Sequence, residues 1–217
     1  MKAKVLILGM VAILCPASSG AAPITFAFEG TVTSVGALDP ANPFPTEPTF
    51  GTPFSGTYTF DSTAADGAPF DPTTGSYGSA GSPFGISIAL GGLTLPYGGV
   101  AIGVTDGYST YGPGDQYLVG FSGGPTLLSL RFTDFSEAMF STDALPLSPI
   151  ALTGLFTELI LSDIVDGNQV DLQGTITSLT CSAGCSGTPP LPEPSIVPLL
   201  GAGIGALGGV RYLRRRA

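Results

Sequence analysis

The chain has 217 residues, no histidine, no tryptophan and a formal net charge of −9. A strongly acidic chain repels the phosphates of nucleic acids, which excludes nucleic-acid binding as a function class. The lack of histidine excludes Ser-His and Cys-His nucleophilic sites and the usual zinc catalysis. A pair of carboxylates suffices for glycoside hydrolysis, so composition leaves that class of enzyme open.

Residues 1–22 predict a secretory signal peptide. Lys2 and Lys4 form a charged start, residues 5–14 form an apolar run, and residues 19–22 form a small-residue cleavage region. We expect cleavage after Ala22. A lipoprotein signal at Cys15 is disfavoured, because Leu14 stands where a small residue is needed. Once both terminal segments are set aside, Arg131 is the one remaining cation, so the exported part is acidic and would attract divalent cations.

Residues 23–186 predict a single all-β domain, because apolar and polar side chains alternate with a period of two through most of this segment. About nine strands are expected, at residues 24–33, 54–61, 75–79, 84–90, 100–105, 117–122, 127–134, 155–162 and 170–179. Residues 36–53 predict a long proline-rich loop, and a short helix would fit only near residues 136–140. Strands with one apolar face pack most readily as two antiparallel sheets, so we predict an antiparallel, jelly-roll-like β-sandwich.

The segment from Tyr108 to Asp115 is a candidate ligand loop. Its Tyr108 and Tyr111 could stack on sugar rings in a chain that lacks tryptophan, and Asp115 adds a carboxylate. The alternative is an ordinary exposed loop.

Four oxygen-bearing residues, Asp163, Asp166, Asn168 and Asp171, fall within nine residues of sequence. Carboxylate and amide oxygens are the ligands that Ca²⁺ prefers, which makes calcium the one cofactor that the sequence raises. The EF-hand spacing is missing, so a hairpin turn is the alternative interpretation.

Cys181 and Cys185 predict a disulfide, because they form an even pair on the exported side of the membrane, where disulfides persist. A loop this short would rigidify the base of the following linker more than it would stabilise the domain. A metal site would need further ligands, and no histidine is present to supply them.

The last part of the chain is built differently from the rest. A proline-rich linker at 187–194 leads into an apolar segment at 195–213, which predicts a transmembrane helix, and a basic tail follows at 214–217. The uncharged run is a little short for a bilayer core of roughly 30 Å, but arginines that reach outward to the headgroups close most of the gap. The basic stop cluster, Arg211, Arg214, Arg215 and Arg216, is expected to stay on the cytoplasmic side, with the preceding chain outside. A buried core helix is the disfavoured alternative.

This tail resembles the PEP-CTERM sorting signal of exported proteins in Gram-negative bacteria. The resemblance covers Pro192–Ala217 and lies in the motif Pro192-Glu193-Pro194, the glycine-containing apolar segment and the terminal arginines. It implies recognition by an exosortase, a membrane-embedded cysteine protease or transpeptidase, and processing near the motif. Delivery to the cell surface or the exopolysaccharide matrix would follow. The sortase and GPI signals fit less well, because Pro194 and Ser195 replace the Thr and Gly of the first, and the second lacks a basic end.

The sequence therefore favours an exported, non-enzymatic cell-surface or matrix protein, with exosortase and the membrane as partners. A carbohydrate-binding module for exopolysaccharide is the alternative. A secreted hydrolase comes third, because the acidic residues lie in turn signals or on the polar sides of strands.

Overall fold

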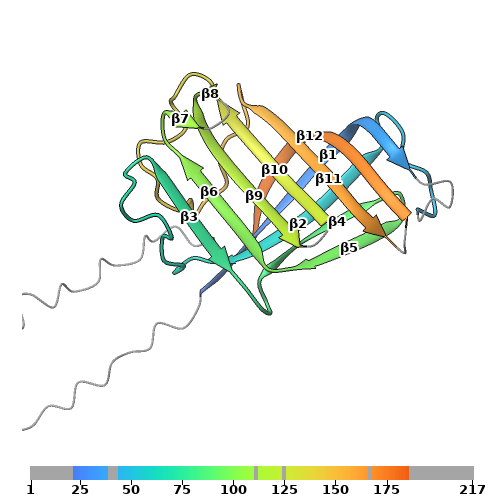
Figure 1. Ribbon diagram of the computed structural model, residues 1–217, viewed down its shortest axis with the longest axis horizontal. Coiled ribbons are helices and arrows are strands. Elements are labelled where there is room, and N and C mark those ends of the chain that lie inside the picture. The colour runs from blue at the N-terminus through green and yellow to red at the C-terminus, as the bar shows by residue number, and fades with distance from the viewer. Residues whose placement is uncertain (1–21, 39–43, 110–111, 124–125, 166–167, 186–217) are drawn as a thin grey trace, which may run out of the picture. The chain divides into compact units, whose positions relative to one another are not determined.

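The computed structural model describes residues 22–38, 44–109, 112–123, 126–165 and 168–185. These residues form an all-β structure without a helix, which confirms the predicted class (Figure 1). The strands are β1 (Pro23–Leu38), β2 (Pro53–Asp61), β3 (Thr74–Ser79), β4 (Gly85–Leu90), β5 (Leu93–Gly98), β6 (Val100–Thr105), β7 (Tyr108–Ser109), β8 (Gly112–Pro113), β9 (Asp115–Gly123), β10 (Thr126–Asp134), β11 (Phe156–Val165) and β12 (Asn168–Ala183).

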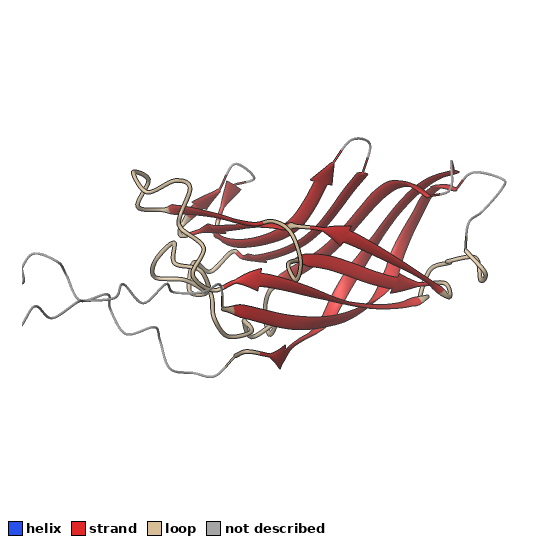
Figure 2. Ribbon diagram, turned by 90° about the horizontal axis from the view of Figure 1, so that it is seen from below, coloured by secondary structure: helices blue, strands red, loops and turns tan. Residues whose placement is uncertain are grey.

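Ten of these strands form one antiparallel sheet in the order β3-β6-β9-β10-β11-β12-β1-β2-β4-β5, and β7 pairs only with β8. The sheet curls over itself, so that its two arms enclose the core (Figures 1 and 2). We expected two separate sheets. The structure differs because β1 and β12, each 16 residues long, pair with each other and so join the two arms into one sheet.

The central strands contain both bulges and close contacts between aromatic rings and glycines. The pairing of β1 with β12 shifts register at four places, and such bulges increase local twist and curvature. The ring of Phe54 lies directly over Gly30 and Gly174, and a β-carbon at either position would collide with it. Phe28 covers Gly56 in the same way. Glycine is therefore required at these positions to let the rings approach the backbone.

The core is formed by the inward-facing residues of both arms. Phe26 contacts Tyr58 and Phe60 edge-on, with ring centroids 5.4 Å and 5.5 Å apart. The hydroxyl oxygens of Tyr58 and Tyr117 lie 3.3 Å apart, fully buried between β2 and β9. Burial raises the pKa of both phenols, so both stay protonated.

Two local predictions differ from the structure. Strand β5 was not expected. It contains Pro96, and the structure places the strand at the edge of the sheet, where a missing N–H costs no ladder bond. Residues 136–140 form turns, not a short helix. Asp134 and Asp115 accept their backbone N–H groups, which replaces the bonds that a helix would have made.

Substitution of Gly174 by alanine should destabilise the domain, because the new methyl group would displace the ring of Phe54. We expect a loss of about 1–3 kcal/mol of unfolding free energy, measured by urea denaturation. Gly78→Ala is the matched control, since nothing lies within 4 Å of a β-carbon there. Equal stability of the two variants would show that the ring does not depend on Gly174.

Candidate functional site

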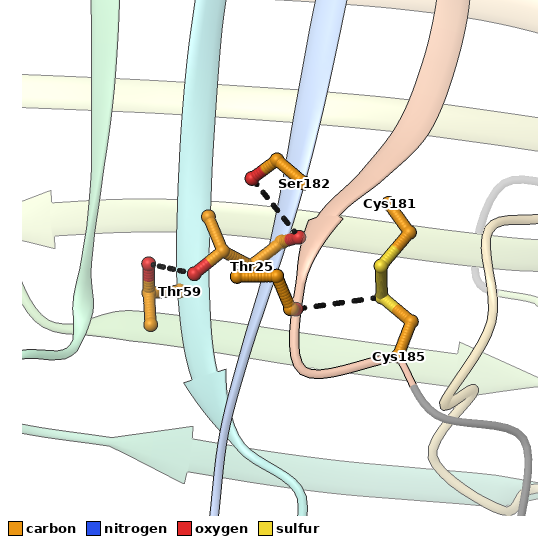
Figure 3. Close-up of a disulfide and its surroundings, with 6 residues drawn as sticks. Thr25, Thr59, Cys181, Ser182 and Cys185 are labelled. Atoms are coloured by element: carbon orange, nitrogen blue, oxygen red, sulfur yellow. Dashed lines mark hydrogen bonds between the residues drawn. A yellow bond between two sulfur atoms is a disulfide. The ribbon is translucent and has the colours of Figure 1, made fainter.

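The two ends of the described domain lie side by side. Thr25 near the start of β1 pairs with Ala183 at the end of β12. Gly184 adopts a φ of 79°, and a β-carbon on it would strike the carbonyl of Pro23. Figure 3 shows the Cys181–Cys185 disulfide at this turn, with an S–S distance of 2.03 Å. The disulfide thus holds the point at which the chain leaves the domain.

The predicted targeting segments are not part of the described structure. Residues 1–21, Pro192-Glu193-Pro194, the apolar segment 195–213 and the arginine cluster all lie outside the described residues. No helix within the described ranges is long and apolar enough to cross a membrane.

The candidate ligand loop is a small hairpin. Tyr108 begins β7, Tyr111 lies outside the described residues, and Asp115 is fully buried below the hairpin. The Asp115 carboxylate accepts the N–H of Gly107 at 2.9 Å and that of Phe140 at 2.7 Å. Asp115 therefore connects the base of the hairpin to a distant segment, and its buried carboxylate is not exposed to a ligand.

The predicted calcium ligands do not meet at one point. Asp163 faces the interior, whereas Asp171 lies on the outer face, because Asp171 pairs with Ser162 and neighbouring strand residues alternate between faces. One ion could not contact both carboxylates. Asp166 lies outside the described residues, and Asn168 opens β12. The described part of the chain holds no group of three Cys, Asp or Glu side chains arranged for a metal ion.

Asp163 instead binds two hydroxyl groups from other strands. Tyr97 of β5 donates to one carboxylate oxygen at 2.5 Å, and Thr126 of β10 donates to the other. The Tyr97 ring also stacks on Phe121 of β9, with centroids 5.3 Å apart. Burial raises the pKa of Tyr97, and the Asp163 carboxylate adds to the increase. This cluster fastens the edge strand β5 across the interior to the opposite arm.

Asp134 and Asp115, which pair across β9 and β10, hold the long segment 135–155, which we call the capping loop. Asp134 accepts from the Ser136 N–H at 2.8 Å, the Ser136 hydroxyl at 2.6 Å and the Ala138 N–H at 3.0 Å. The loop packs partly buried apolar side chains against the core, among them Phe140, whose ring lies 6.3 Å from that of Tyr117. Both carboxylates are thus acceptors for a structural loop.

The outer face of β1, β2 and β4 is rich in hydroxyl groups. The side chains of Thr25 and Thr59 lie 2.9 Å apart, and those of Thr57 and Ser87 lie 3.2 Å apart. Two adjoining depressions of about 420 Å³ and 470 Å³ share Pro53 and Ala89 at one end of this face. Their polar lining comes from Glu29, Thr46, Thr52, Ser55, Thr94 and Thr177.

This hydroxyl-rich face was not predicted as a site. The alternating threonines of the first two strands are visible in the sequence, but the pairing that brings them together is not. The arrangement offers many hydrogen-bond donors and acceptors with a single carboxylate, Glu29, which suits a neutral polyhydroxylated ligand.

Another pocket lies elsewhere on the outer face, at the bulged part of β1. It measures about 230 Å³ and is lined by Ser34, Ser162, Asp171 and Gln173 among others. The Asp171 carboxylate accepts from Ser162 at 2.6 Å and from the Gln169 amide at 2.7 Å. Its acceptors are thus engaged by neighbouring side chains.

The sheet also carries a partly exposed ion pair that involves Arg131. Its guanidinium nitrogen lies 3.1 Å from a carboxylate oxygen of Glu158 on the neighbouring strand. A pair of this kind contributes about 0–1 kcal/mol, so it does not decide the fold.

The stability of the domain should depend on the ionisation of Asp134. Hydrogen bonds from the hydroxyl and N–H of Ser136 lower the pKa of this carboxyl below its ordinary value. Its contribution is therefore complete above the unfolded-state pKa of about 3.9 and is lost as the pH falls through the lower folded-state pKa. Urea denaturation from pH 7 to pH 2 should show wild type more stable than Asp134→Asn at neutral pH and the difference vanishing in acid. A pH-independent difference would contradict this mechanism.

Comparison with protein-family models, with curated proteins and with solved structures finds no match for this chain. The family resemblance therefore rests on the amino-acid sequence alone. Function has to be argued from the order of the segments and from the chemistry of the described domain.

Proposed function

We propose that this chain is an exported, non-enzymatic cell-surface or exopolysaccharide-matrix protein that an exosortase sorts and processes at Pro192-Glu193-Pro194. The observation that carries the proposal is the order of its segments: a secretory signal, a β-domain, the motif, an apolar segment and an arginine cluster. In this proposal residues 195–213 hold the chain in the inner membrane of a Gram-negative cell until it is processed.

Two features of the domain support export. Its compact unit ends at Cys185, seven positions before Pro192, so the motif follows the folded domain in the sequence and is not part of it. The Cys181–Cys185 disulfide suits an oxidising compartment and stands at the exit of the chain.

The use of the carboxylates supports a non-enzymatic role. Asp115 and Asp134 accept hydrogen bonds from the backbone of the capping loop, and Asp163 accepts from two hydroxyl groups. A glycosidase needs one carboxylic acid and one carboxylate that both face the substrate. These three buried groups are instead occupied within the domain.

Replacement of Pro192-Glu193-Pro194 by three alanines should abolish processing and change the location of the protein. Cell fractionation and intact mass measurement, in a host with an exosortase, would then find the full tail retained in the inner membrane. The matched control replaces Pro189 and Pro190 by alanine, which changes the linker but keeps the motif. Unchanged surface delivery of the motif variant would overturn the proposal.

A second candidate function, binding of a neutral exopolysaccharide, is favoured by the hydroxyl-rich face. The depressions at Pro53 and Ala89 are lined by hydroxyl side chains and by the exposed carboxylate of Glu29. Sugar hydroxyls donate well to carboxylates, and such charge-assisted bonds are about twice as strong as neutral ones.

Glu29→Gln should weaken retention of the purified protein on the exopolysaccharide of its host by about threefold to tenfold, because a charge-assisted bond is lost. Affinity electrophoresis in gels with and without the polysaccharide measures the change. Glu137→Gln, which changes an exposed carboxylate in the capping loop and not in the lining of either depression, should leave retention unaltered. Equal retention of both variants and wild type would remove this face as the binding site.

A further inference from the structure

Both backbone polar groups of Ala22 are engaged by the end of β2. The Ala22 nitrogen donates to the Asp61 carboxylate at 3.2 Å, and its carbonyl accepts from the nitrogen of Ser62 at 3.0 Å. Pro23 follows as the first residue of β1 and pairs with Asp61. The hydrogen-bonded domain therefore begins one residue before the first strand.

The Asp61 carboxylate accepts several hydrogen bonds at this position. The same oxygen, Oδ1, also accepts the N–H of Thr63 at 2.9 Å and its hydroxyl at 2.7 Å. Partial burial raises the pKa of Asp61, but the hydrogen bonds from Thr63 and Ala22 lower it by more. The pKa of Asp61 is therefore below its ordinary value, and the carboxyl group stays ionised. The described segments that meet here, 22–26, 59–65, 79–81 and 181–185, contain no other titratable side chain, since both cysteines are in the disulfide.

We infer that signal peptidase cleaves the Ala21–Ala22 bond and that Asp61 binds the α-ammonium group of Ala22 in the mature protein. The inference rests on the proposed export. Hydrolysis adds one water molecule: Ala21 leaves with a new carboxylate, and the freed nitrogen of Ala22 becomes an ammonium group. The ammonium group offers the Asp61 carboxylate three N–H donors and a positive charge. The amide of the uncleaved chain offers it one N–H and no charge.

Cleavage after Ala22, which the small residues of the signal peptide led us to expect, fits the structure less well. It would remove the carbonyl to which Ser62 donates, and the bond to be cut would be a tertiary amide to the rigid ring of Pro23. Cleavage after Ala21 still places small residues, Ser19 and Ala21, at the third and first positions before the bond.

The first test is the intact mass and amino-terminal sequence of the full chain after export from a Gram-negative host. We expect the mature protein to start at Ala22. A start at Pro23 or any other internal residue overturns this inference and leaves the proposed export standing. Retention of Met1 overturns both.

The second test measures how fast the new amino group reacts, which depends on how much of it is unprotonated. The only lysines, Lys2 and Lys4, leave with the signal peptide, so the Ala22 amine is the one primary amine of the mature chain. An amine-reactive label at pH 7 should react about twofold to fivefold faster in Asp61→Asn than in wild type, because the loss of the carboxylate lowers the pKa of the amine.

Asp71→Asn is the matched control for this measurement. Asp71 makes the same turn with Thr73 that Asp61 makes with Thr63, accepting its N–H at 3.0 Å and its hydroxyl at 2.8 Å. We expect the wild-type labelling rate in this variant. Equal rates for Asp61→Asn and Asp71→Asn would overturn the ion pair.

Discussion

The pairing of β1 with β12 is the constraint on which the rest of the structure depends. These two strands come from opposite ends of the domain and form the middle of the sheet, so every other strand of the sheet extends one of two arms from them. Their ladder is interrupted by bulges, and glycines there admit the ring of Phe54. The curvature that follows brings the arms face to face, which is what encloses the core.

Once the sheet has curled, polar side chains connect the arms and cover the space between them. The paired hydroxyls of Tyr58 and Tyr117 cross the interior near its centre, and Asp163 receives Tyr97 from the edge strand. Asp115 and Asp134 hold the capping loop, which packs against the core. Buried polar groups need hydrogen-bond partners. In this domain the carboxylates accept hydrogen bonds from the backbone N–H groups of the capping loop and from hydroxyl groups.

The closeness of the domain's two ends is a consequence of the same pairing. Because β1 and β12 are neighbours, Ala22 and Cys185 lie at the same end of the domain. Asp61 binds the first of these two residues, and the disulfide holds the second. In the proposed function both targeting segments would leave the domain from this point. In that proposal, the amino-terminal and the carboxyl-terminal processing events would both take place in segments that adjoin this position of the fold.

The sequence by itself determined the class of the fold and most of its strands, because alternation of apolar and polar residues is a local property with a period of two. It also carried the turn signals Asp61-Ser-Thr63, Asp71-Pro-Thr73 and Asp134-Phe-Ser136, in which a carboxylate binds the backbone two residues on. Only the tertiary structure decided that the strands form a single curled sheet, that Asp163 and Asp171 face opposite ways, and that Asp115 is buried. These outcomes depend on the register between strands far apart in the chain, and a shift of one residue would turn each side chain to the other face.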